Sequence, residues 1–233
     1  MVDLAIRDVP RRDLPEAADM LSSALGFRAR DSIPPWVILT TTEAGGLAIG
    51  AYRRARLIGF SYAFPALTAG RAYLYSCGLA VAEDERGRGV GRRLKLAQRD
   101  RAIALGIPAI RWTADPMSAP ALNLYLSRLG ATLVGYRAGL FTGLRAHTVP
   151  QDDVEIAWEL DGARGSAPPS GGKEAIHVEI PADVHRLSTR QATEWRRRVR
   201  RLMSALIDDG YVGTAVERAP GAERCRIRFV REP

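Results

Sequence analysis

The sequence is poor in cysteine and lysine and has no long apolar run. Cys77 and Cys225 lie far apart and do not suggest a disulfide framework. No run approaches the roughly 20 apolar residues that a membrane-spanning helix needs. The N-terminal segment MVDLAIRDVPRRDLPE is charged throughout and lacks the apolar core of a signal peptide. These absences predict a soluble protein of the cytoplasm with no membrane partner.

The chain has a net charge of +8, and nearly all of its cations are arginine. Such a charge suggests a nucleic-acid partner, but apart from two clusters the arginines are scattered, and the abundant alanine and glycine fit a GC-rich genome equally well. Nucleic acid is therefore not an expected partner. The histidines His147, His177 and His185 show no metal-ligand spacing, so no metal site is expected.

Apolar periodicity and turn residues divide the chain into strands and helices. Strands are predicted over 4–9, 47–52, 57–64, 73–81, 109–113, 132–141, 154–160, 175–180, 211–217 and 224–230. Helices are predicted over 14–26, capped by Asp13, over 119–129, capped by Ser118, and over about 183–209. A further helix over 92–105 has its apolar positions at Leu94, Ala97, Ile103 and Leu105. Residues 35–43 fit either a short helix or a strand.

The composition changes after residue 160. Residues 161–174 are rich in Gly, Pro and Ser and are interpreted as a linker between a domain over 1–160 and a C-terminal β-α-β-β extension over 175–233. At about 60 residues the extension is small for an independent core, so we expect it to dock on the first domain. On its helix Trp195 and Val199 should pack. The Arg196–Arg201 cluster should be solvated, or alternatively bind a substrate carboxylate.

The segment ERGRGVGRRL, residues 85–94, holds the first arginine cluster and a glycine loop. Its spacing fits neither a mononucleotide-binding loop nor a dinucleotide fingerprint, but it matches R-x-x-G-x-G between a strand and a helix. Glycines there let successive N–H groups converge on an anion, and the helix N-terminus adds positive potential. The predicted anion-binding residues are Arg86, Gly87, Arg88, Gly89, Val90, Gly91 and Arg92. The alternative is a surface turn with no ligand.

The longer segment CGLAVAEDERGRGVGRRLKLAQ resembles the acetyl-CoA-binding motif of the GCN5-related N-acyltransferase (GNAT) superfamily, and the resemblance covers roughly residues 1–145. It implies a mixed α/β (α+β) fold with a mostly antiparallel sheet, splayed between the strands 73–81 and 109–113. It also implies that acetyl-CoA or another acyl-CoA is the co-substrate. The pantetheine would pair with Leu79, Ala80 and Val81, and the loop would hold the pyrophosphate. Asn123 would contact the cofactor or be solvated.

A second set of segments, RWTADPMSAPALNLYLSRLGATLVGYRAGLF followed by DDVEIAWEL, VEIP and EWRRRVR, resembles one branch of that superfamily. The genes of this branch often neighbour those of N-acylamino-acid racemase/o-succinylbenzoate synthase enzymes. The resemblance implies transfer of an acetyl or succinyl group to the amine of a small acceptor, an amino acid being favoured. Apart from the resemblance, the sequence is compatible with a homodimer. The alternatives are a non-catalytic CoA-binding module and a protein N-acetyltransferase.

N-acyl transfer needs a neutral amine, donors for an oxyanion and a proton for the leaving thiolate. The superfamily often takes that proton from a tyrosine at the position that Leu126 occupies here. The neighbouring Tyr125 is the candidate acid, with a packed aromatic as the alternative. Cys77 stands where the branch has a histidine, and is either a base or nucleophile or a buried strand residue. Asp115 either meets the substrate amine or caps the turn after it.

Overall fold

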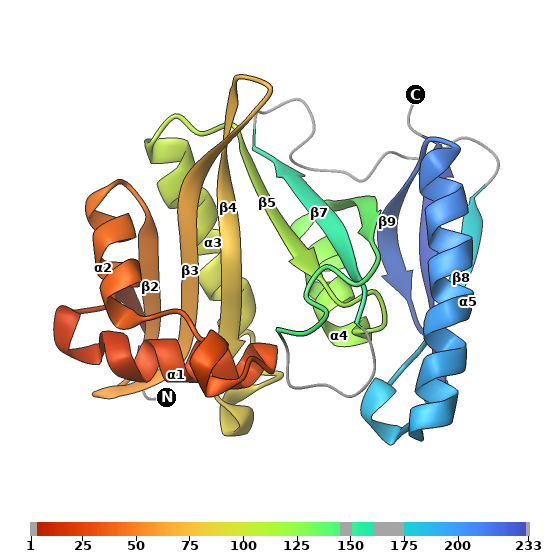
Figure 1. Ribbon diagram of the computed structural model, residues 1–233, viewed down its shortest axis with the longest axis horizontal. Helices are drawn as coiled ribbons and strands as arrows, with labels where there is room; N and C mark the ends of the chain where they lie inside the picture. Colours follow the sequence, from red (N-terminus) through yellow and green to blue (C-terminus); the bar gives the residue numbers. More distant parts are fainter. Residues whose placement is uncertain (1–3, 145–150, 161–174, 232–233) are drawn as a thin grey trace. The chain divides into compact units, whose positions relative to one another are not determined.

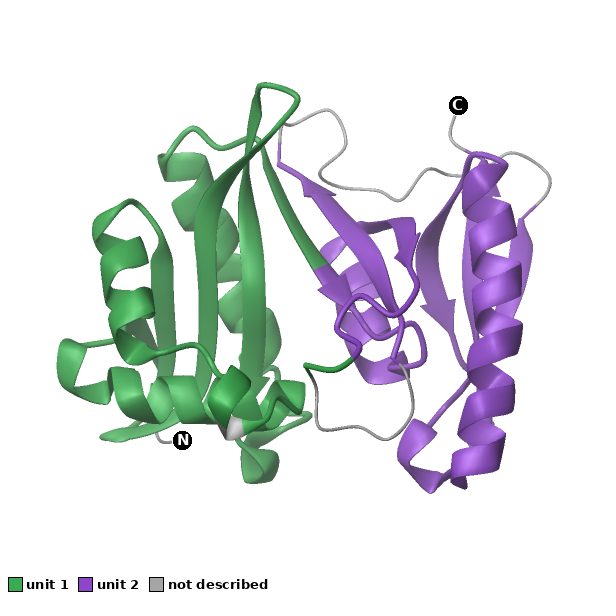
Figure 2. Ribbon diagram, viewed as in Figure 1, with its two compact units in different colours: residues 1–112, 143–146 green, residues 113–142, 147–233 purple. Residues whose placement is uncertain are grey.

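A computed structural model describes residues 4–144, 151–160 and 175–231, the side chain of residue 29 excepted. The chain divides into two units, one of residues 1–112 and 143–146, the other of residues 113–142 and 147–233 (Figure 2). The division falls inside the strand β5, Ala109–Ala114. The domain boundary predicted at residue 160 stays a prediction, and the predicted linker over 161–174 lies outside the described residues.

The first unit contains a sheet of β1 Leu4–Asp8, β2 Leu47–Arg53, β3 Arg56–Thr68, β4 Arg71–Val81 and β5, in that order. Neighbours pair antiparallel except β4 and β5, which run parallel. The hairpin predicted over 47–64 is confirmed, and its turn places Arg54 at a φ of 57°. This mixed, mostly antiparallel arrangement agrees with the predicted fold class.

Three helices cover the sheet of the first unit. In Figure 1, α1 Leu14–Leu25 and α2 Pro35–Glu43 lie in front of the strands and α3 Val90–Ala104 lies behind them. Residues 35–43 therefore adopt the helical alternative, with Pro35 in the first turn, where no backbone N–H is needed. Asp13 precedes α1 but does not cap it, because its carboxylate accepts a hydrogen bond from the Tyr52 hydroxyl at 2.9 Å instead.

The buried face of α3 differs from the predicted one. Ile103 and Leu105 are 54% and 53% exposed, although the sequence placed them on the apolar face. The residues that lie buried instead are Val90, Leu94, Lys95, Gln98 and Ala102. Val90, Leu94, Gln98 and Ala102 recur every four residues and form a row against the sheet, and Lys95 lies next to that row. The two polar side chains can be buried there because the strands offer them hydrogen-bond partners.

The second unit begins with α4 Ala119–Leu122, a π-helical turn over Asn123–Arg128, β6 Thr132–Arg137 and β7 Asp153–Glu159. The chain continues with β8 Ile176–Pro181, α5 Thr189–Asp208, β9 Tyr211–Glu217 and β10 Arg224–Arg231, as predicted for a β-α-β-β extension. The strands follow the order β7-β6-β9-β10-β8. Leu133 in β6 pairs with Gly213 in β9, so the extension continues the sheet of residues 132–159.

The helix predicted over 119–129 is interrupted. Its last part widens into the π-helical turn. After this turn the chain reverses at the left-handed Gly130, and the Ala131 N–H donates to the carbonyl of Tyr125 at 3.0 Å. Such π-helical turns are rare and occur often at functional sites. Because the wider turn changes which side chains face inward, Tyr125 and Leu126 are both buried. Ser118 makes no side-chain capping bond, contrary to the prediction.

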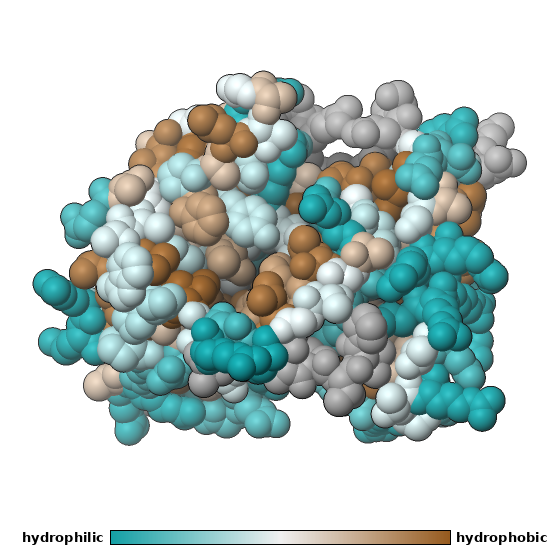
Figure 3. Space-filling model, viewed as in Figure 1, coloured by the Kyte–Doolittle hydropathy of each residue, from teal (hydrophilic) through white to brown (hydrophobic). Residues whose placement is uncertain are grey.

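Helix α5 begins at Thr189, later than predicted, because Ser188 and Gln191 form a capping box there. Val199 is buried as predicted, and Met203 and Arg196 are buried as well, whereas Trp195 is only partly buried. The outward face of α5 is hydrophilic (Figure 3). In the part of the chain that the structure describes, no helix combines the length and apolar character needed to cross a membrane.

Candidate active site

Strands β4 and β5 of the first unit form a fork. Their parallel register pairs Leu74 with Ile110 and Tyr75 with Arg111. Among the described residues, this pairing ends at Tyr75, so residues 76–81 of β4 have no partner in β5. Figure 1 shows the two strands diverging from the paired end. The predicted splay between strands 73–81 and 109–113 is thus present, and it leaves the second half of β4 with a backbone edge that another extended chain can pair with.

A β-bulge lies in β4 where the fork opens. Tyr62 of β3 pairs with Gly78 and Ala63 pairs with Ser76, so Cys77 is the extra residue with no partner in this register. Bulges interrupt a ladder and turn backbone groups out of it. Cys77 packs on the cluster beneath α1, and burial raises the pKa of its thiol to about 11. The thiol is therefore neutral at pH 7 and poorly suited to act as a base or nucleophile.

The bulge also decides which face each residue of β4 presents. The Ser76 hydroxyl meets the Lys95 amine of α3, whereas a Cβ on Gly78 would meet Leu21 of α1 at 2.4 Å. Beyond the bulge, Ala80 packs in the α1 cluster. Alternation then places the side chains of Leu79 and Val81 on the α3 face. The predicted pantetheine-pairing residues therefore continue along β4 toward the glycine loop.

The glycine loop follows β4 after the short 3₁₀ turn Glu83–Glu85. Gly87 and Gly89 have φ angles of 74° and 79°, in the left-handed region that favours glycine. Residues 86–89 are exposed. The first backbone bond of α3 runs from the Arg93 N–H to the Gly89 carbonyl at 3.1 Å, and the N–H groups of residues 87–92 donate to no other described backbone group. These free donors at a helix N-terminus fit the phosphates of an acyl-CoA.

An ion pair between the buried Glu85 and the partly exposed Arg53 anchors the loop. The carboxylate of Glu85 accepts two hydrogen bonds from the Arg53 guanidinium of β2, at 2.9 and 3.0 Å. The hydrogen bond from Arg53 holds the pKa of Glu85 below its usual value. The side chain of Arg86 turns back and donates to the carbonyl of Val81 at 3.2 Å, while Arg88 lies 3.8 Å from Glu85. Arg92 and Arg93 are exposed and available to an anion.

The second unit holds the remaining predicted residues. Asp115 accepts a hydrogen bond from the Met117 N–H at 2.8 Å, as the capping alternative requires, and pairs with the buried Arg196 at 3.3 Å. Its catalytic role stays a prediction. Burial raises the pKa of Tyr125 to about 12, so its hydroxyl is protonated at neutral pH and can serve as a proton donor. Asn123 is partly exposed in the same π-helical turn.

Two more arginines of the cluster on α5, Arg198 and Arg200, have partners within the second unit, whereas Arg197 and Arg201 are exposed as the solvated alternative predicts. Arg200 donates to Asp152 at 2.6 and 2.9 Å. Burial raises the pKa of Asp152, but hydrogen bonds from Arg200, Tyr136 and Gly139 outweigh burial and leave that pKa below its usual value. Arg198 lies near Glu179 and over the Trp195 ring. The structure therefore gives several of these arginines structural partners, a role the sequence analysis did not assign.

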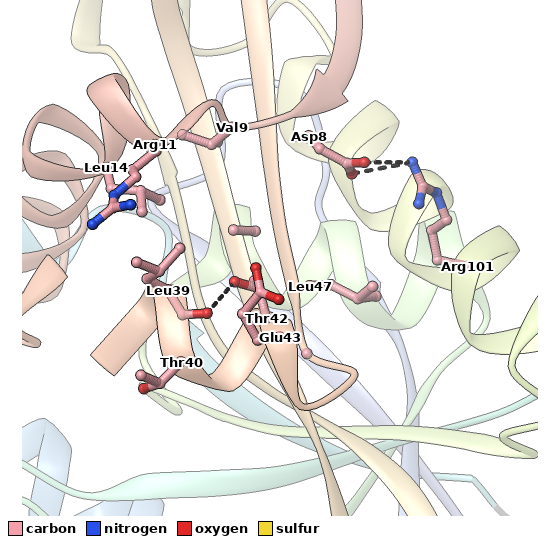
Figure 4. Close-up of a pocket in the computed structure, with 12 residues that line it drawn as sticks. Asp8, Val9, Arg11, Leu14, Leu39, Thr40, Thr42, Glu43, Leu47 and Arg101 are labelled. Carbon is pink, nitrogen blue, oxygen red and sulfur yellow. Dashed lines mark hydrogen bonds and ion pairs between the residues drawn. The ribbon is translucent and has the colours of Figure 1, made fainter. Parts of the chain in front are cut away.

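A hollow of about 750 Å³ lies elsewhere in the first unit (Figure 4). It forms between the end of β1, the start of α1, the end of α2 and the start of β2, beside Arg101 of α3. Arg101 and Asp8, which both line it, form a salt bridge at 3.1 Å. The residues that line it are Asp8, Val9, Arg11, Leu14, Leu39, Thr40, Thr42, Glu43, Gly46, Leu47, Ala48 and Arg101. None of them is a predicted site residue.

Sequence reasoning missed Lys95, which is 1% exposed on α3, and its partners Ser76 and Gln98. The sequence nevertheless contains a pattern from which a buried Lys95 could have been predicted. Lys95 is one of two lysines among many arginines, and it directly follows Leu94. Gln98 lies about one helical turn from both Leu94 and Ala102. Polar residues on the helix face that packs against a sheet indicate that the strands provide buried hydrogen-bond partners.

Comparison with known families matches residues 6–131 to the Acetyltransferase (GNAT) family. The match covers more than half of the chain, which therefore belongs to the GNAT acetyltransferase family and is an acyltransferase. Comparison with curated proteins finds no match.

Solved structures share the fold. IAA acetyltransferase from Bacillus cereus ATCC 14579 is 21% identical at a TM-score of 0.53, covering 68% of this chain and 100% of that one. The ribosomal-protein-S18-alanine N-acetyltransferase from Escherichia coli is 19% identical at 0.54, covering 71% and 99%. A GNAT family acetyltransferase from Elizabethkingia anophelis with acetyl-CoA bound is 18% identical at 0.55, covering 67% and 99%. At these identities the likeness concerns the fold.

Proposed function

We propose that this protein is a CoA-dependent N-acyltransferase that moves an acetyl or succinyl group from acyl-CoA to the amine of a small acceptor, an amino acid being favoured. The observation that carries the proposal is one continuous stretch of the first unit. The unpartnered edge of β4 leads directly into a loop whose N–H groups at 87–92 are free. An extended amide-containing arm followed by a diphosphate matches that stretch in order and in hydrogen-bonding character.

The chemistry in this proposal is direct attack. The neutral amine forms a C–N bond with the thioester carbonyl carbon, the C–S bond breaks, and the nitrogen loses a proton while the thiolate gains one. Backbone N–H groups at the Cys77 bulge are the proposed donors to the oxyanion. Tyr125 is the proposed acid. The raised pKa of Cys77 argues against a covalent acyl-cysteine, because a neutral thiol is a weak nucleophile.

The amino-acid acceptor rests on the resemblance of the segments from Arg111 to Phe141 to the racemase-associated branch. The structural neighbours differ in their acceptors, since one is an IAA acetyltransferase and another acts on alanine of ribosomal protein S18. Fold alone therefore does not choose the acceptor. A non-catalytic CoA-binding module also fits the first unit, because Leu126 occupies the superfamily's usual acid position.

A substrate panel separates these functions. Acetyl-CoA and succinyl-CoA are each combined with L- and D-amino acids and with a peptide that has a free N-terminal alanine, and release of free CoA thiol is measured. Turnover with an amino acid supports the proposal. Turnover with the peptide alone favours a protein N-acetyltransferase. CoA binding without turnover on any amine favours the non-catalytic module, and absence of CoA binding contradicts all three.

A further inference from the structure

The amine of Lys95 lies where the β4–β5 fork opens. Its Nζ donates to the Ser76 hydroxyl at 2.8 Å and to the Gln98 side-chain carbonyl at 3.4 Å, and it lies 3.6 Å from the centre of the Trp112 ring. Lys95 is 1% exposed, and burial lowers its pKa well below the usual value. Burying an amine costs free energy unless its N–H groups donate hydrogen bonds, so the burial of Lys95 needs a structural explanation.

The sheet register supplies that reason. The last pair between the two strands joins Tyr75 to Arg111, and the next residues along β4 and β5 are Ser76 and Trp112. These are the first residues beyond the paired end of the fork. Lys95 contacts both of them, one by a hydrogen bond and the other through the face of its ring. The amine thus bridges the side chains of the first residue of each strand beyond the paired end.

The contacts extend to a third strand. The side-chain amide of Gln98 accepts from Lys95 and donates to the Ser61 hydroxyl of β3 at 2.5 Å. Residues on β3, β4 and β5 are therefore tied to one turn of α3. The same helix begins at Val90, inside the anion-binding loop. A shift at Lys95 would change the position of the β4 edge relative to the free amides.

We propose that Lys95 is a positioning residue that sets how far β4 and β5 separate and holds the bulged part of β4 in place relative to the loop at the start of α3. The inference rests on the proposed acyltransferase function, because only then does this spacing place a thioester against the bulge. The lysine itself does not touch the reacting atoms. It acts through Ser76, which precedes the bulged Cys77.

The test compares Lys95→Met with Arg99→Met, a control on the same helix whose side chain is partly exposed and pairs with Asp100 instead of with the sheet. Methionine keeps most of the apolar volume but removes the donors to Ser76 and Gln98. We expect kcat to fall at least tenfold, because a displacement of about 1 Å at a reacting centre costs about a hundredfold. The Kd for CoA, set by the loop, should stay within about threefold. Arg99→Met should leave both values unchanged.

Hydrogen exchange separates this inference from the proposed function. In Lys95→Met, peptides covering residues 74–81 and 109–112 should exchange at least tenfold faster, while peptides of β2 and β3 keep their protection. If the wild-type protein transfers no acyl group, the proposed function fails, and exchange still decides whether Lys95 holds the fork. If Lys95→Met does not fold, Trp112→Phe replaces it, with Trp36→Phe as its control. Unchanged exchange together with unchanged kcat in the folded variant overturns the proposal.

Discussion

Replacing Gly89 with leucine in the proposed pyrophosphate loop should affect stability and CoA affinity to different extents. Gly89 has a φ of 79°, and a Cβ built on it meets no atom within 4 Å. In the free protein, leucine therefore adds only the strain of a left-handed residue, about 1–2 kcal/mol. In the complex, the side chain would stand where phosphate oxygens approach the N–H groups of residues 87–92. We expect a small loss of stability and a large loss of CoA affinity.

The size of that loss follows from the hydrogen bonds at the loop. A bond to a charged oxygen contributes about 1.5–3 kcal/mol. Losing one strong bond or two weaker ones costs about 3 kcal/mol, which raises the Kd for CoA about a hundredfold. Gly70 is a matched control because it has a φ of 75°, meets no atom within 4 Å, and lies at the opposite end of β4 from the loop.

Isothermal titration with CoA and urea unfolding of both variants test this reasoning. Gly89→Leu and Gly70→Leu should lose similar amounts of unfolding free energy, since both take on the same backbone strain. Gly89→Leu alone should lose CoA affinity. The reasoning is refuted if Gly89→Leu binds CoA within about threefold of the wild-type protein, because the ligand would then not approach this backbone.

Three further predictions follow from the site and the second unit. Tyr125→Phe should lower kcat about 10²–10⁴-fold with CoA affinity retained, and a loss below about threefold in stopped-flow assays would make the tyrosine structural. Burial raises the pKa of Cys77 to about 11, so iodoacetamide at pH 8 should alkylate this thiol about two hundred times more slowly than free cysteine. Mass spectrometry of the peptide that contains Cys77 measures the rate, and rapid alkylation would contradict the burial of the thiol. Arg200→Met leaves the buried Asp152 without its cation and should lower the free energy of urea unfolding by about 2–3 kcal/mol. Arg201→Met is the control, and an equal loss of unfolding free energy in that variant would show that the effect comes from removing any arginine of this helix and not from the pair with Asp152.

Local sequence determined the order of the elements and the glycine loop. The hairpin over 47–64, the strand before the loop and the helix after it were predictable, because alternation, turn residues and helical periodicity act between near neighbours. The positive φ angles of Gly87 and Gly89 need residues without a Cβ, and the sequence provides glycine at both positions. The C-terminal β-α-β-β order was predictable for the same reason. The residues of the candidate anion site are therefore contiguous in the chain and recognisable from their spacing.

Tertiary structure alone decided which polar groups are buried. Lys95 lies inside while Ile103 and Leu105 are exposed, because Ser76 and Trp112 on separate strands meet the lysine at the fork. Arg196 is buried because Asp115, far away in the chain, pairs with it. The bulge at Cys77 likewise depends on the register with β3. Each outcome depends on partners distant in sequence, and helical or strand periodicity carries no information about such partners.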